Sequence, residues 1–237
     1  MAEYTLLTEY RGLFESHKYQ HRDSTLGDFV AMHLYEDLVT LKKSDRYVLH
    51  VTEMSRVLNV RNRRVGIEAR RGDGTLGELV PGVEPIVDPG YSVARGPIAN
   101  VEIGVEVKIL SKSMIKQIDR VQGDLAKQVQ EFKRKAGSSQ PICVAVVGVN
   151  FASVATGYEG RRKYRTDGKQ NKHPIQEANE AVARVKKVTS EFDELVILRY
   201  RATNEKPYAF EWVDEEETRQ EYGAALIRIS NEYQRRF

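Results

Sequence analysis

Residues 141–151, with the sequence PICVAVVGVNF, restrict the fold more than any other stretch, because nearly every position is apolar. A strand with one face in water alternates apolar and polar residues, whereas a continuous apolar run of this length is typical of a strand covered on both faces. Helices that connect parallel strands provide such a cover in α/β proteins. The run therefore predicts an interior strand of an α/β sheet.

A second stretch, residues 101–110 (VEIGVEVKIL), alternates with a period of two. One side carries Val101, Ile103, Val105, Val107 and Ile109, and the other carries Glu102, Gly104, Glu106, Lys108 and Leu110. This period predicts a strand with one apolar face. Residues 112–136 follow, with apolar residues at helical spacing and a glycine at their end. Strand, helix and strand together predict a right-handed unit in which segments 101–110 and 141–151 are parallel.

The remaining patterns complete a mixed sheet flanked by helices. They predict helices at 26–43, 174–191 and 215–235, strands at 47–52, 84–88, 194–201 and 208–213, and a loop or hairpin at 158–173 around Asp167-Gly168. The glycine-rich residues 72–77 indicate a turn. We therefore predict one domain over residues 1–237, with a core at about 26–201 and a C-terminal strand and helix within 207–235.

Composition limits the class of protein. Apolar residues make up 41% and charged residues 30% of the chain, which is typical of a globular protein and not of a disordered one. No apolar run approaches the roughly 20 residues of a membrane span, and the N-terminus lacks the pattern of a secretory signal. The single cysteine, Cys143, excludes an intrachain disulfide. We expect a cytoplasmic protein without a membrane partner.

Glu106 and Lys108 present a carboxylate and an ammonium on the same side of the strand. Such a pair is either a solvated surface pair or part of a site that holds a metal ion and a water. With Asp88 upstream and a basic helix downstream, the pattern Asp88, Glu106-Val107-Lys108 resembles the PD-(D/E)xK nuclease superfamily. Many restriction endonucleases belong to this superfamily.

The resemblance implies a restriction-endonuclease-like sheet and a Mg²⁺ site. Mg²⁺ prefers oxygen ligands, which would be the carboxylates of Asp88 and Glu106 and the carbonyl of Val107. Lys108 would orient the attacking water and stabilise negative charge on the phosphate. The chain departs from the family pattern because its proline follows Asp88 and does not precede it. Glu84 and Asp73 are therefore the alternatives for the first acid.

Other positions have two interpretations each. Glu36 on the first helix, and Gln128 and Gln130 on the long helix, resemble accessory residues of the superfamily, although each also suits a plain helix surface. The arginine-rich residues 55–71 and the basic residues 158–173 are either solvated or contact phosphate groups. The five histidines do not cluster with cysteines or acids at the spacings of a zinc site.

The sequence thus predicts a Mg²⁺-dependent endonuclease that cleaves double-stranded DNA. A type II restriction enzyme, or a similar antiviral defence nuclease, that leaves 5′-phosphate ends is the main expectation. Cleavage of both strands of a palindrome favours a homodimer. One alternative is a non-specific or structure-selective repair or antiphage nuclease. The other is a catalytically silent nucleic-acid-binding domain.

Overall fold

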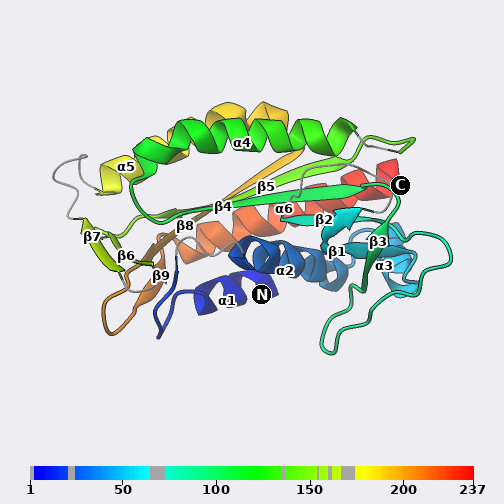
Figure 1. The fold of residues 1–237 in the computed structure, drawn as a ribbon, viewed down its shortest axis with the longest axis horizontal. Helices are drawn as coiled ribbons and strands as arrows, with labels where there is room; N and C mark the ends of the chain where they lie inside the picture. Colours follow the sequence, from blue (N-terminus) through cyan, green and yellow to red (C-terminus); the bar gives the residue numbers. More distant parts are fainter. Residues whose placement is uncertain are drawn as a thin grey trace.

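The computed structural model of this chain describes residues 3–20, 25–64, 73–134, 137–153, 155–159, 162–166 and 174–237 (Figure 1). The helices are α1 (Thr5–Gly12), α2 (Thr25–Leu41), α3 (Asp45–Thr52), α4 (Met114–Arg134), α5 (Pro174–Val185), the 3₁₀ helix η1 (Lys186–Glu191) and α6 (Glu215–Arg236). The strands are β1 (Arg56–Arg64), β2 (Gly74–Glu78), β3 (Arg95–Ile98), β4 (Ile103–Leu110), β5 (Ile142–Asn150), β6 (Ala155–Glu159), β7 (Arg162–Thr166), β8 (Glu194–Ala202) and β9 (Phe210–Trp212).

Seven of these strands form one mixed sheet in the order β3-β1-β2-β4-β5-β8-β9. Strands β4, β5 and β8 are mutually parallel, whereas β2 runs antiparallel to both β1 and β4. Strand β9 is antiparallel to β8, and β6 and β7 form a separate hairpin. The predicted mixed α/β architecture and the parallel pairing of segments 101–110 and 141–151 are confirmed.

Helices cover both faces of the sheet, as Figure 1 shows. Helices α4 and α5 pack on one face around a core that contains Phe132, Cys143 and Val147. Helices α1, α2 and α6 pack on the other face around a larger core that contains Leu34, Val105 and Val144. All nine residues of β5 are buried between these layers, so the prediction of an interior strand is confirmed.

Strand β4 has the predicted alternation. Its side chains Ile103, Val105, Val107 and Ile109 contribute to the core on the α2 and α6 side. Gly104, on the opposite face, lies against the ring of Phe132 and has no room for a Cβ. Glu106 and Lys108 therefore point toward the α4 side of the sheet, because they share the face of Gly104.

Two strand predictions before β4 were wrong. Residues 47–52 belong to helix α3, because Ser44 accepts a hydrogen bond from the N–H of Tyr47 and Tyr47 and Val51 are buried one turn apart. Residues 84–88 form no strand, and only Ile86 makes an isolated bridge, to Arg95. The opposite error concerns the turn predicted at residues 72–77, because residues 74–78 form strand β2.

Smaller corrections concern element ends. The basic hairpin exists, with Glu159 of β6 paired to Arg162 of β7, so it is not centred on the predicted Asp167-Gly168 pair, which lies outside the described residues. The helix predicted at 174–191 is α-helical only to Val185 and continues as η1. Of the arginine-rich segment, residues 65–72 lie outside the described residues. None of the helices in the described ranges has the length and apolarity needed to cross a membrane.

Candidate active site

Glu106 and Lys108 lie in the middle of β4, beneath helix α4. The Lys108 Nζ donates a hydrogen bond to Glu106 Oε1 over 2.5 Å. The Glu106 side chain is only 9% exposed, whereas that of Lys108 is 26% exposed. The carboxylate is thus almost buried, and the lysine side chain is the more exposed member of the pair.

Asp73 is the acid that the structure brings to this pair. It immediately precedes β2, whose first residue, Gly74, is the partner of Val105 on β4. Continuing this antiparallel register by one residue places Asp73 opposite Glu106. Asp73 Oδ2 accepts a hydrogen bond of 2.7 Å from the N–H of Val107.

The first turn of helix α2 also contacts Asp73. Gly27, the third residue of α2, lies so close to the Asp73 carboxylate that it has no room for a Cβ. A negative charge at the N-terminus of a helix is favourable, because the helix dipole is positive there. Helix α2 therefore helps to position the acid, although the sequence offered no motif for this contact.

The backbone of Val107 adds an oxygen at the same edge. The N–H and C=O of one strand residue point to the same side of the strand. Since the N–H of Val107 points to Asp73, its carbonyl also faces the edge of β4 where Asp73 lies. Two carboxylates and one carbonyl are thus grouped at the position where β2 begins beside β4.

The electrostatics of the site are dominated by burial. Burial raises the pKa of Glu106 from 4.5 to about 7, and the negative charges of Asp73 and, less strongly, Asp124 on α4 act in the same direction. The charge of Lys108 and its hydrogen bond oppose the rise. A carboxyl with this pKa exchanges its proton near neutral pH, which suits a group that binds a cation or a proton in turn.

The raised pKa predicts that Glu106 destabilises the fold at alkaline pH. The folded state holds the proton of this carboxyl more tightly than the unfolded state, so its stabilising contribution is complete below pH 4.5 and is lost as the pH rises through 7. Glu106→Gln removes the titration. The free energy of unfolding of this variant, relative to the parent, should therefore be higher at pH 8 than at pH 5 by about 2 kcal/mol. Urea unfolding at both pH values measures this difference, and an equal difference at both would refute it.

Asp88, the predicted first acid, is not brought to Glu106. Its carboxylate accepts hydrogen bonds from Nε and Nη2 of Arg95, which hold the pKa of Asp88 below its usual value. Arg95 begins β3, and β1 and β2 separate β3 from β4. Because neighbouring strands are about 4.8 Å apart, this places the Asp88 pair about 14 Å from the Glu106 strand. The alternative acid Glu84 is exposed in the same segment before β3.

The accessory residues have different positions. The carboxylate of Glu36 accepts hydrogen bonds from the backbone N–H groups of Ser92 and Val93, so it holds the segment before β3. Gln128 is buried on the face of α4 that packs against the sheet, one turn after Asp124. Gln130 is exposed. Of the three, Gln128 alone lies on the α4 face toward the sheet.

Glu102 belongs to another part of the molecule, although the alternation placed it beside Glu106. It precedes β4, and its carboxylate accepts hydrogen bonds from the hydroxyl of Tyr233 on α6 and from Nε of Arg56 on β1. Glu102 is therefore a buried link between β1, β4 and α6.

Within the described parts of the chain, no three His, Cys, Asp or Glu side chains form a group that could hold a metal ion. A metal ion bound here would use the two carboxylates, a backbone oxygen and ligands from outside the chain. In comparisons with known proteins, no family model, curated protein or solved structure matches this chain.

Proposed function

We propose that this protein is a Mg²⁺-dependent endonuclease that hydrolyses the phosphodiester bonds of double-stranded DNA, with Asp73 in the role expected for Asp88. The observation that carries the proposal is the grouping of Asp73, immediately before β2, with Glu106 and Lys108 of the neighbouring strand β4. One acid followed by an acid and a lysine on a later strand are the residue types of the PD-(D/E)xK superfamily.

The order of elements supports the same assignment. Helix α2, strands β1, β2 and β4, helix α4 and strand β5 occur in this order, with helix α3 inserted before β1 and strand β3 before β4, and β4 and β5 are parallel neighbours. A restriction-endonuclease-like core has this order of helix, three strands, helix and strand. Strand β3 is an addition at the edge of the sheet beside β1.

The donor atoms suit Mg²⁺. Carboxylate oxygens and a backbone carbonyl are hard ligands, and Mg²⁺ commonly takes one or two carboxylates and fills its remaining positions with water and substrate phosphate. Asp73, Glu106 and the Val107 carbonyl would hold the ion. The ion would polarise the scissile phosphate and lower the pKa of a bound water.

The side chains have separate roles in this proposal. Lys108 would leave Glu106 to hold the attacking water and stabilise the negative charge that develops on the phosphate. Glu106, whose pKa is about 7, would release its proton as a cation binds. The hydrogen bond from Val107 N–H would keep the Asp73 carboxylate at the edge of β4.

DNA contacts are proposed for two basic segments. The hairpin of β6 and β7 follows β5, and β7 has the basic sequence RKYRT. Strand β1 carries several of the arginines in residues 55–71. Guanidinium groups bind phosphate oxygens and guanine edges, so these segments would clamp the backbone and read bases. A homodimer would present two such sites to a palindrome.

Incubation of the purified protein with supercoiled plasmid and phage DNA in Mg²⁺, with an EDTA control, tests the proposal. Cleavage that requires Mg²⁺ and leaves 5′-phosphate ends is expected. Discrete bands from phage DNA would identify a restriction enzyme, whereas a continuous smear would identify a non-specific nuclease. The opposite outcome is a protein that binds DNA in EDTA and does not cleave it when Mg²⁺, Mn²⁺ or a lysate-derived cofactor fraction is added. This outcome would identify a silent binding domain and refute the proposed nuclease function.

A further inference from the structure

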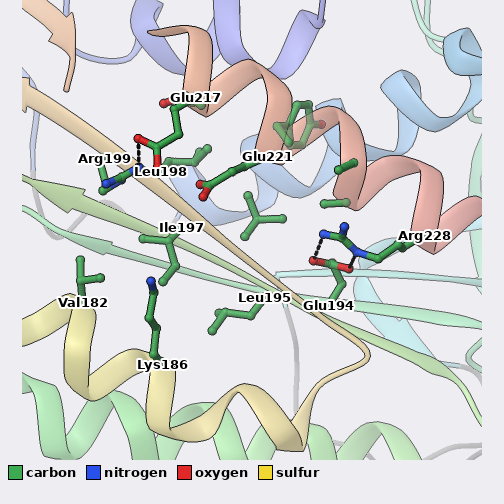
Figure 2. A pocket seen from close by; sticks show the side chains of 15 residues that line it. Val182, Lys186, Glu194, Leu195, Ile197, Leu198, Arg199, Glu217, Glu221 and Arg228 are labelled. Carbon is green, nitrogen blue, oxygen red and sulfur yellow. Dashed lines mark hydrogen bonds and ion pairs between the residues drawn. The ribbon is translucent and has the colours of Figure 1, made fainter. Parts of the chain in front are cut away.

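Strand β8 borders a pocket of about 290 Å³ that runs along the strand edge (Figure 2). The lining includes all six consecutive residues 194–199 of β8, which means that the pocket follows the edge of the strand and not one of its faces. Val182 and Lys186, from α5 and η1, form one wall. Helix α6 forms the other wall, from Glu217 to Arg228.

The strand edge in this pocket is unpaired within the described chain. Strand β9 pairs only with Tyr200, Arg201 and Ala202 of β8, and a further bond joins Val213 N–H to the carbonyl of Arg199. Since alternate residues of a strand point their backbone groups to the same side, the N–H and C=O groups of Leu195 and Ile197 face this pocket. They form a ready template for another strand.

The two walls present opposite charges. Figure 2 shows the Lys186 ammonium and the Glu221 carboxylate directed into the pocket from opposite walls. Neither has an ion pair within the described residues, whereas Arg199–Glu217 and Arg228–Glu194 are paired at the two ends. A strand inserted between the walls would direct successive side chains to opposite walls. An acidic residue next to a basic residue would therefore satisfy both charges.

We propose that this groove binds an extended peptide segment of a partner protein by strand addition to β8, with adjacent acidic and basic residues that contact Lys186 and Glu221. Strand addition supplies backbone hydrogen bonds, and the wall charges supply selectivity. A second copy of β8 fits less well, because two edges that are both recessed between helices cannot approach each other. The proposal is independent of the proposed nuclease function.

Capped peptides of about six residues, the length of the strand segment in the groove, provide the probe. The test peptide has a central Glu-Lys pair between β-branched residues. It is compared with peptides that have Lys-Lys or Glu-Glu at the centre and the same flanking residues. Binding is measured by fluorescence anisotropy and by the amide shifts of Leu195 and Ile197 in NMR spectra. The Glu-Lys peptide should bind about fivefold more tightly than either control.

Backbone methylation distinguishes strand addition from other binding. Alternate N–H groups of an added strand face β8, so N-methylation of one alternate set should weaken binding about tenfold or more, whereas methylation of the other set should have little effect. Equal effects of the two sets, or no peptide binding above the methylated controls, would overturn the proposal.

Charge reversal on the protein provides the matched control. Lys186→Glu should exchange the preference from the Glu-Lys to the Lys-Lys peptide, and Glu221→Lys should exchange it to the Glu-Glu peptide. Both residues are on the surface, so the variants should fold as the parent does. An unchanged preference in both variants would contradict the proposal. Self-association of the parent without peptide, lost in these variants, would instead assign the groove to a second copy and overturn it.

Discussion

Asp73→Asn should reduce Mg²⁺-dependent plasmid cleavage by two to three orders of magnitude, whereas Asp88→Asn should leave the rate close to that of the parent. The asparagine at 73 can still accept the hydrogen bond from Val107 N–H, so the variant changes the charge beside Glu106 and preserves the shape. Loss of a group that stabilises charge in a transition state costs on the order of 10²–10³-fold in rate. Asp88 is paired with Arg95, which begins β3, so its charge lies away from the proposed site at Glu106.

Initial rates of supercoiled plasmid nicking at saturating Mg²⁺ measure both variants, with Glu106→Ala and Lys108→Ala as further inactive forms. Thermal unfolding of Asp73→Asn checks that the loss is chemical, because a folded variant should melt at or near the parent temperature. If Asp88→Asn lost activity and Asp73→Asn retained it, Asp88 would be the ligand and the site described above would be wrong. Full activity of Glu106→Ala and Lys108→Ala would end the nuclease assignment itself.

Glu102→Ala should lower the free energy of unfolding by about 3–5 kcal/mol, because it removes one partner of a buried charged network. Glu102 is only 3% exposed. Its two oxygens accept hydrogen bonds from Arg56 Nε at 2.5 Å and from the Tyr233 hydroxyl at 2.6 Å, and that hydroxyl also bonds to His50 Nδ1. Without Glu102, Arg56 Nε and the Tyr233 hydroxyl lose this charged acceptor, and the guanidinium keeps its hydrogen bond to the carbonyl of Ser55.

Urea unfolding at neutral pH measures this effect, and Glu211→Ala is the matched control. Glu211 also pairs with an arginine, Arg201, but its side chain is 66% exposed. Exposed pairs contribute little, so this variant should unfold within about 1 kcal/mol of the parent. Equal losses in the two variants would show that burial of Glu102 does not determine its contribution. The Glu102 variant should keep the Lys108–Glu106 pair, because the two carboxylates point to opposite layers of the protein.

The sequence predicted the centre of the sheet well, for a clear physical reason. An alternating run indicates a strand with one buried face, and a short fully apolar run that is rich in valine indicates a strand buried on both faces, so residues 101–110 and 141–151 are predicted as strands with a helix between them. The same alternation placed Glu106 and Lys108 together on one face, because residues two apart on a strand share a face by geometry. The hydrogen bond between them agrees with this.

The first acid could not be predicted in the same way. The sequence of strand β2 resembles a turn because it contains Gly74 and Gly77. Both glycines are instead required by close packing, Gly74 against Ala31 and Gly77 against the backbone of Asn100. With β2 missed, Asp73 looked like a turn residue. Asp88 is preferred on the sequence because its position upstream of Glu106-Val107-Lys108 resembles the superfamily pattern, and the sequence contains no sign that Arg95 would bind it.

The sequence by itself determined which residues lie in β4 and β5, that these strands are parallel, and that Glu106 and Lys108 share a face, because these properties depend on local periodicity. Only the tertiary structure decided which acid joins them, which charges are buried, and which strand edge is left open. Those properties depend on contacts between residues far apart in the chain: Asp73 with Val107, Glu102 with Tyr233, and β8 with a β9 that covers only its end. Cross-strand register and helix packing set such contacts, and neither leaves a local signal in the sequence.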